Sequence, residues 1–441
     1  MKICIIGTGY IGLTEGLCFA DLGHDVMCFD IVKEKIEKLK QGIPTIYEDG
    51  LEEMLKRNLQ SKKITFTCDL KEALNSAEVV FICVNTPESQ KDGSADLTAL
   101  MGATKMVAET MDVNNKFVLV IRSTVPVGTN KKVKEHVKNI NGNLQFMMAS
   151  NPEFSRQGSA IRDFLKPDRI IVGVDNEYSK EVMANVYKPL TDRGAPILFT
   201  TIETAELIKY ASNGFLAMKI SFINEIADIC EKTGANIDEI AKAMGMDKRI
   251  SPYFLQAGPG IGGSCFPKDS IALVRIGREL GLDMELMYAS VESNKKRKKR
   301  MAQKIIEASE YSLRNKHIAL LGLTFKANTD DTRYSPALDI IKQLNKKKIF
   351  VNAYDPHGLE NIKHMLPEEN LKKNNFFNNP YDAIKDSELL VIDTEWSEFK
   401  ELDFKKIYDL LKQKTIIDLR NILNREEIEK LGFNYICIGK K

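Results

Sequence analysis

The feature that most constrains this chain is an alternation of short Val/Ile-rich runs with longer segments of helical period. The alternation is typical of a parallel β-sheet covered by helices on both faces. We expect six strands in the first stretch, at residues 2–6, 25–29, 78–84, 117–121, 144–149 and 169–174.

The alternation stops near residue 201, where apolar residues at helical spacing predict one long amphipathic helix over 201–232. It restarts with four further strand-type runs, at residues 317–321, 349–354, 388–392 and 414–418. We therefore expect an α/β protein with two Rossmann-like, doubly wound parallel-sheet domains, joined by a long central helix and a helical middle domain. The expected domains are residues 1–200, 201–312 and 313–441, which suits a length of 441 residues.

The two stretches resemble a distant internal repeat. The paired segments are KICIIG with HIALLG (2–7 and 317–322), VMCFD with VNAYD (26–30 and 351–355), and AEVVFICVNT with SELLVIDTEW (77–86 and 387–396). After the first strand, however, GTGYIG stands in one copy and GLTFKA in the other. We therefore expect two nucleotide sites that serve different ligands.

Composition excludes several classes of protein. Lys and Arg number 63 and Asp and Glu 61, a balance that gives no general attraction to nucleic acid, and no apolar run is long enough for membrane insertion. The basic run KKRKKR at 295–300 resembles a nuclear import signal or a nucleic-acid patch. It follows a predicted helix in a chain of balanced charge, so we predict a solvated helical face. The eight cysteines show neither metal-ligand nor disulfide spacing, and the N-terminal residues lack signal-peptide features. We expect a cytoplasmic protein with reduced thiols and no metal.

Three glycines follow the first predicted strand and open a helix. Gly7 suits a tight turn, Gly9 lets the backbone approach a pyrophosphate, and Gly12 lets the helix pack closely on the strand. Asp30 ends the second strand, where an acid binds the adenosine ribose and repels a 2′-phosphate. This pattern predicts NAD as cofactor rather than NADP; the alternative is a glycine-rich turn without a ligand.

Cys265 lies between a glycine cluster at 258–263 and a predicted helix that begins near Pro267. Backbone amides, the helix N-terminus and Lys268 would all favour the nucleophilic thiolate. The other cysteines are mostly expected to be small buried residues. A cysteine nucleophile beside a nicotinamide suggests oxidation of an aldehyde through a thiohemiacetal and a thioester.

Such chemistry needs an oxyanion stabiliser and a water molecule. Lys209 and Asn213 are four residues apart on the long helix and share a face, although a solvated Lys and a packing Asn are equally compatible with that spacing. Thr124 and Glu153 each follow a predicted strand, at the edge where open α/β sheets bind ligands.

Two cations follow the first strand of the second α/β stretch, in the segment GLTFKANTDDTR. Lys326 and Arg333 are candidates for contacts with a phosphate or a sugar. A surface role is the alternative for both.

Over nearly its whole length the chain resembles the nucleotide-sugar 6-dehydrogenases. The matching motifs, in the order of the family, are GTGYIG (7–12), IYEDGLEEML (46–55), STVPVGT (123–129), NPEF (151–154), ELIKYASN (206–213), GMDKRI (245–250), GGSCFPKD (262–269) and FKANTDDTR (325–333). The resemblance implies oxidation of a sugar C6 alcohol to a carboxylate with two NAD, through a cysteine thioester.

The resemblance also assigns residues to roles. Cys265 would be the nucleophile, Lys209 and Asp269 would stabilise the alkoxide and oxyanion and position water, and Thr124 with Glu153 would assist thioester hydrolysis. The catalytic set implied is Cys265, Lys209, Asp269, Thr124, Glu153 and Asn213. The positions around NAD are Gly7, Gly9, Ile11, Gly12, Asp30, Lys35, Thr124, Lys268 and Arg333. The positions around the sugar nucleotide are Glu153, Phe154, Lys209, Asn213, Arg249, Phe254, Leu255, Gln256, Ala257, Gly258, Gly262 and Lys326.

By the same resemblance the first domain binds NAD, the middle domain carries Cys265 and the contacts of a homodimer or higher homo-oligomer, and the last domain binds the UDP-sugar. Ser264 and Lys268 disfavour an N-acetylated substrate, while IYEDGLEE and GMDKRI favour the branch acting on UDP-glucose over that acting on GDP-mannose. Gln157 stands where the family usually carries Glu, near the nicotinamide, so the charge there is lost. An NAD-binding regulatory protein without turnover is the alternative from another class.

Overall fold

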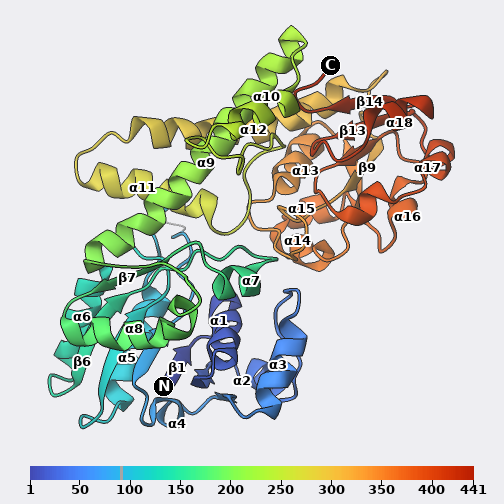
Figure 1. Cartoon of the computed structure of the whole chain (residues 1–441). Helices are drawn as coiled ribbons and strands as arrows, with labels where there is room; N and C mark the ends of the chain where they lie inside the picture. Colours follow the sequence, from blue (N-terminus) through green and yellow to red (C-terminus); the bar gives the residue numbers. More distant parts are fainter. Residues whose placement is uncertain (90–92) are drawn as a thin grey trace. The chain divides into compact units, whose positions relative to one another are not determined.

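The computed structural model describes residues 1–89 and 93–441, in two compact units that comprise Met1–Ser212 and Asn213–Lys441. Each unit is built on its own β-sheet (Figure 1). Within the described residues, none of the helices is both long enough and apolar enough to cross a membrane.

The first unit contains an eight-stranded sheet in the order β3-β2-β1-β4-β5-β6-β7-β8. Its strands are β1 (Lys2–Ile6), β2 (Asp25–Phe29), β3 (Ile64–Thr67), β4 (Val79–Ile82), β5 (Lys116–Ile121), β6 (Gln145–Ser150), β7 (Ile170–Val174) and β8 (Ile197–Thr200). The predicted parallel sheet is confirmed, with one antiparallel pair, β6 with β7. Only a loop and a six-residue helix join these two strands, so no long crossover helix returns the chain for a parallel pairing.

Helices cover both faces of this sheet, as the alternation predicted. They are α1 (Tyr10–Asp21), α2 (Lys33–Lys40), α3 (Leu51–Gln60), α4 (Leu70–Leu74), α5 (Thr98–Thr110), α6 (Thr129–Ile140), α7 (Ala160–Leu165) and α8 (Glu177–Thr191). Alternate residues of one strand enter different cores: Ile3 and Ile5 of β1 belong to one, Cys4 and Ile6 to the other. This explains the near-continuous apolar runs in the sequence.

The long helix predicted over 201–232 is α9 (Ile202–Thr233). The second unit then adds helices α10 (Ile237–Met246), α11 (Phe266–Glu279) and α12 (Glu285–Glu307). Its six-stranded sheet has the order β11-β10-β9-β12-β13-β14. The strands are β9 (His317–Leu321), β10 (Phe350–Tyr354), β11 (Asn375–Phe376), β12 (Leu390–Ile392), β13 (Thr415–Asp418) and β14 (Asn434–Cys437). The remaining helices are α13 (Pro336–Lys346), α14 (Leu359–Met365), α15 (Glu368–Leu371), α16 (Pro380–Ile384), α17 (Phe404–Leu410), α18 (Arg425–Lys430) and the 3-10 helix η1 (Ser397–Lys400).

The predicted repeat has a structural counterpart in the loop after the first strand of each sheet. The carboxylate of Asp30, at the end of β2, accepts hydrogen bonds from the amide and hydroxyl of Thr8, both at 2.8 Å. Asp355, at the end of β10, accepts bonds from the amides of Leu323 and Thr324 at 2.6 and 3.1 Å. In both copies an acid directly after the second strand fixes the turn that follows the first strand.

For the basic run at 295–300 the structure differs from the prediction. Its members lie on α12, and Arg297 and Lys298 are buried, so the prediction of a solvated face is wrong for these two. The pattern of charges in the sequence could not reveal this burial, because the carboxylates that neutralise Arg297 and Lys298 come from distant segments of the chain.

Candidate active site

The first glycine loop has the geometry that a dinucleotide requires. Gly7 has a φ of +96°, and a Cβ on Gly12 would lie 1.9 Å from the carbonyl oxygen of Gly7. At Gly9 the nearest described atom to such a Cβ is 4.0 Å away, which leaves room for a ligand beside the backbone. The loop leads into α1, whose first turn contains Ile11, so the free amides at this helix N-terminus would suit an anion. The residues present therefore fit the pyrophosphate of NAD.

Asp30 completes this loop. Its Oδ1 accepts a hydrogen bond from the amide of Val32 at 3.0 Å, while Oδ2 binds Thr8. Burial raises the pKa of Asp30, but these hydrogen bonds and the charge of Lys35 outweigh it and bring the pKa below its ordinary value. Asp30 is therefore an anion at neutral pH, beside the nucleotide loop.

We expect a kcat/KM with NAD at least about 100-fold above that with NADP, because a 2′-phosphate would face the Asp30 carboxylate and like charges at close range cost several kcal/mol. Steady-state kinetics with both cofactors measure this ratio. Asp30→Asn keeps the size of the side chain and one acceptor for the Thr8 amide but removes the negative charge. The preference for NAD over NADP should therefore fall. Equal or better turnover with NADP would remove Asp30 from the ribose.

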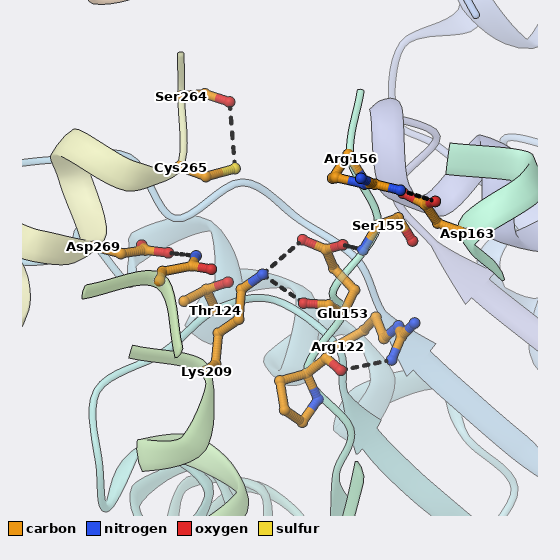
Figure 2. Close-up of polar contacts among 12 residues, drawn as sticks. Arg122, Thr124, Glu153, Ser155, Arg156, Asp163, Lys209, Ser264, Cys265 and Asp269 are labelled. Atoms are coloured by element: carbon orange, nitrogen blue, oxygen red, sulfur yellow. Dashed lines mark hydrogen bonds and ion pairs between the residues drawn. The ribbon is translucent and has the colours of Figure 1, made fainter. Parts of the chain in front are cut away.

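Lys209 and Glu153 form a buried pair within the first unit. Figure 2 shows the Lys209 ammonium directed at Glu153, where it donates to the backbone oxygen at 2.5 Å and to Oε1 at 3.2 Å. The other carboxylate oxygen of Glu153 accepts from the amide of Ser155 at 2.7 Å. Glu153 follows β6 and Lys209 is on α9, so two elements position a cation and an anion together. The predicted Lys209 is thus not a solvated side chain.

An ion pair that sequence reasoning missed supports the segment containing Glu153. The guanidinium of Arg122, just after β5, binds both carboxylate oxygens of Glu15 on α1 at 2.5 and 2.6 Å, and both side chains are buried. Arg122 also donates to the backbone oxygens of Asn151 and Pro152 at 2.7 and 3.1 Å. The residues directly before Glu153 are therefore fixed by a cation from the neighbouring strand.

Glu48, in the segment IYEDG, holds the chain on the other side of Glu153. Its two carboxylate oxygens accept from the amides of Gly158 and Ala160, each at 2.7 Å, and from the hydroxyl of Tyr10. Gln157 directly precedes Gly158, and its Oε1 is buried and accepts no hydrogen bond from the described residues. An orphaned buried acceptor fits a donor on a bound ligand.

Cys265 is the N-cap residue of α11, as the position of Pro267 predicted. Its side chain is exposed, and the sulfur is 3.7 Å from the hydroxyl oxygen of Ser264 (Figure 2). The carbonyl oxygen of Cys265 accepts a hydrogen bond from the amide of Asp269 at 2.8 Å, and this bond forms the first turn of α11. Arg333 is close enough for its charge to interact with Cys265. The thiol is thus accessible, at a helix N-terminus and near a cation.

Asp269 and Asn213 meet in the same unit. Asn213 donates from Nδ2 to Asp269 Oδ2 at 2.7 Å, and both side chains are buried. The ammonium of Lys268 is 3.0 Å from Asp269 Oδ1. The Asn213 amide is therefore oriented by a carboxylate one helical turn from Cys265.

The glycine cluster before Cys265 packs tightly on the segment with Lys326. A Cβ on Gly262 would lie 2.8 Å from the carbonyl oxygen of Tyr334, and one on Gly263, whose φ is +86°, would lie 2.8 Å from the ring of Phe325. The amide of Gly263 also donates to the carbonyl oxygen of Arg333 at 2.8 Å. The structure thus brings the predicted loop 258–263 and the predicted segment 325–333 together.

Not every predicted residue joins these groups. Arg249 is exposed, and its guanidinium forms an ion pair with Asp247, which is not one of the candidate site residues. Thr124 follows β5 as predicted, and its carbonyl oxygen accepts from the hydroxyl of Thr86 at 2.7 Å. Phe254 has a φ of +64°, and its ring centroid is 5.7 Å from that of Phe266.

Arg420 is a second cation that sequence reasoning missed. It donates to the carbonyl oxygens of Phe325 and Asp393, both at 2.7 Å, and a Cβ on Gly258 would lie 3.6 Å from its Nη1. It therefore lies beside two of the segments assigned to the sugar nucleotide. Its position directly after β13, at the carboxyl edge of a parallel sheet, was the available signal.

Three sequence models of one family match consecutive parts of this chain. They are the NAD binding domain of the UDP-glucose/GDP-mannose dehydrogenase family over residues 1–191, its central domain over 203–296 and its UDP binding domain over 319–425.

Individual relatives match over the full length. A UDP-glucose 6-dehydrogenase of Rhizobium meliloti is 46% identical over 100% of both chains, and one of Rickettsia felis is 46% identical over 100% of this chain and 97% of its own. Among solved structures, a UDP-glucose dehydrogenase from Pyrobaculum islandicum superposes with a TM-score of 0.88 at 36% identity, covering 96% of this chain and 94% of its own.

Proposed function

Because this chain belongs to the UDP-glucose/GDP-mannose dehydrogenase family, we propose that it oxidises the C6 alcohol of UDP-glucose to the carboxylate of UDP-glucuronate. The enzyme is an NAD-dependent oxidoreductase. The observation that carries the proposal is Cys265, exposed at the N-terminus of α11 beside the Asp269–Asn213 pair. Two full-length relatives at 46% identity bear the same activity in their names.

NAD, when bound, accepts a hydride at each of the two oxidation steps. Gly7, Gly9 and Gly12 would hold its pyrophosphate, and Asp30 would bind its adenosine ribose. The other positions that we assign to the cofactor are Ile11, Lys35, Thr124, Lys268 and Arg333. Gln157 would supply its orphaned Oε1 to a donor near the reacting end.

The roles of the protein groups follow from their chemistry. Lys209, held by Glu153, is a buried ammonium suited to stabilising an alkoxide or an oxyanion. The Cys265 thiolate would add to the C6 aldehyde, and loss of a hydride from this thiohemiacetal leaves a thioester. Water would then attack the thioester carbon and release the thiol, and we assign Glu153 and Thr124 to orienting this water. Asn213 would hold the substrate, since Asp269 fixes its amide.

A panel of UDP- and GDP-sugars, with NADH counted per sugar consumed, tests the proposal. UDP-glucose should give two NADH per molecule and release little aldehyde. One NADH per sugar, or a clear preference for GDP-mannose, would contradict the assigned reaction or the assigned substrate. NAD binding without NADH production from any sugar nucleotide would indicate a protein that has lost turnover.

Lys326 is the next test, because it lies in the segment that packs on loop 258–263. A contact between a charged group and a phosphate or hydroxyl contributes roughly 1.5–3 kcal/mol, so Lys326→Ala should weaken UDP-glucose binding about ten- to a hundredfold. Titration calorimetry with UDP-glucose and with NAD measures both affinities. Unchanged affinity for UDP-glucose, or a loss confined to NAD, would exclude Lys326 from the substrate site.

We also propose a cytoplasmic homo-oligomer with the division of labour expected for residues 1–200, 201–312 and 313–441. None of the eight cysteines is in a disulfide, in keeping with a reducing compartment. On α9 the apolar residues Phe215, Phe222 and Ile229 recur at seven-residue spacing and are 57%, 49% and 56% exposed. A second copy of the chain would cover this stripe.

A further inference from the structure

One face of α12 carries three polar side chains that bind the backbone of the site loops. Asn294, Arg297 and Lys298 are spaced i, i+3 and i+4, so they share a face. Arg297 and Lys298 are buried, whereas the other cations of the basic run, at 295, 296, 299 and 300, are exposed.

Asn294 holds Ile261 through both ends of its amide. Its Oδ1 accepts from the amide of Ile261 at 2.7 Å, and its Nδ2 donates to the carbonyl oxygen of Ile261 at 3.1 Å. The neighbouring Gly260 has a φ of +139°, and a Cβ there would lie 3.1 Å from Asn294 Oδ1 and 2.9 Å from Lys298 Cγ. Only a glycine allows the loop to approach this face so closely.

Arg297 fixes the start of the same loop. It donates from Nε to the carbonyl oxygen of Gly258 at 3.0 Å, while the amide of Gly258 donates to Asn224 Oδ1 at 2.8 Å. Its Nη1 binds Asp228 and, at 3.3 Å, the carbonyl oxygen of Asn224. Both backbone polar groups of Gly258 are thereby tied to α9 and α12.

Lys298 connects the face to the second loop of the site. Its ammonium donates to the carbonyl oxygen of Tyr334 at 2.7 Å and is 3.2 Å from Asp339 Oδ2. Arg333 directly precedes Tyr334, and its carbonyl oxygen accepts a hydrogen bond from the amide of Gly263. The loop that ends at Cys265 is thus held at three residues. Gly258 and Ile261 are bound directly by side chains of α12, and Gly263 is bound by the segment that Lys298 anchors.

We propose that Asn294, Arg297 and Lys298 are positioning residues that fix the backbone of loop 258–263, and through it the approach of substrate to Cys265. The inference rests on the proposed function, since it deepens the account of that same site. Burying two cations costs free energy unless their partners are well placed, and apolar residues would satisfy simple helix packing. Here the polar ends contact the backbone amides and carbonyls of the loops, which is how a loop conformation is specified.

Asn294→Ala removes both bonds to Ile261 and is the primary test. Two lost hydrogen bonds should speed amide exchange in a peptide covering 258–264 about tenfold and lower kcat/KM for UDP-glucose by a similar factor. The rate of Cys265 alkylation by iodoacetamide should also change, while the Kd for NAD stays within about twofold of wild type. The matched control is Lys299→Ala, which removes an exposed cation from the same run and should leave all four quantities unchanged.

Arg297→Lys is the second variant, in case Asn294→Ala does not fold. Lysine keeps the charge but lacks the guanidinium, whose separate nitrogens reach Gly258 and Asn224 together. Amide exchange in the peptide 258–264 and the KM for UDP-glucose should therefore both increase. Wild-type exchange, alkylation and kinetics in a folded variant would overturn the inference. If the wild-type enzyme oxidises no sugar nucleotide, the proposed function fails, and the exchange and alkylation rates still decide the positioning role alone.

Discussion

Cys265→Ala should lose at least about 10³-fold in kcat for carboxylate formation, because Cys265 is the exposed thiol at the N-terminus of α11 to which we assign the nucleophilic step. Without a thiol there is no thioester, so the second oxidation has no acyl carrier. NADH release and product mass with UDP-glucose measure the loss. Steady turnover to the uronic acid by this variant would disprove the covalent route.

Cys265→Ser separates binding from chemistry at the same position. The hydroxyl keeps the size of the side chain, but an alkoxide is far harder to form near neutral pH and an ester is a poorer acyl donor to water. The variant should bind UDP-glucose and NAD normally and stall after partial turnover. Intact mass would detect a trapped ester. Iodoacetamide should inactivate the wild type, and more slowly when substrate is present.

Arg122→Met should have the second largest effect, on stability and activity together. It leaves Glu15 buried without its cation, which costs about 3–5 kcal/mol of unfolding free energy. It also removes the two hydrogen bonds by which Arg122 Nη1 holds the backbone at Asn151 and Pro152. Glu153 and Lys209 should therefore shift, and kcat should fall by about a hundredfold. Urea unfolding and steady-state kinetics measure the two effects.

The pH dependence of Arg122→Met provides an independent check. Burial raises the pKa of Glu15, and the opposing effect of Arg122 is lost in the variant. A carboxyl whose folded pKa is above its unfolded value stabilises the fold below the unfolded pKa, and this contribution is lost as the pH rises through the folded value. Arg122→Met should therefore lose unfolding free energy as the pH rises above the ordinary titration range of a glutamate side chain. The double variant Glu15→Leu/Arg122→Met should lack this slope. An equal slope in both would exclude Glu15 as its source.

The sequence predicted the inner strands of both sheets and missed the outer ones. Strands β1, β4 and β5 are buried on both faces, so their apolar runs are continuous. The strands that were missed, β3, β8, β11 and β14, stand at the edges of the two sheets. Each contains exposed or half-buried residues that interrupt its apolar run. A continuous apolar run marks a strand that is buried along its length, and these four strands lack such a run.

By itself the sequence determined the elements that local chemistry specifies: the glycine turn before α1, the acid at the end of β2, and a cysteine at the start of α11. Each depends on residues close together along the chain. Only the tertiary structure decided which distant groups neutralise one another. Glu15 and Arg122 are 107 residues apart, and Arg297 is 39 residues from the glycine that it holds. The sequence does not distinguish a solvated charged residue from a buried one. Ion-pair and hydrogen-bond partners that are far apart along the chain can therefore be identified only from the folded structure.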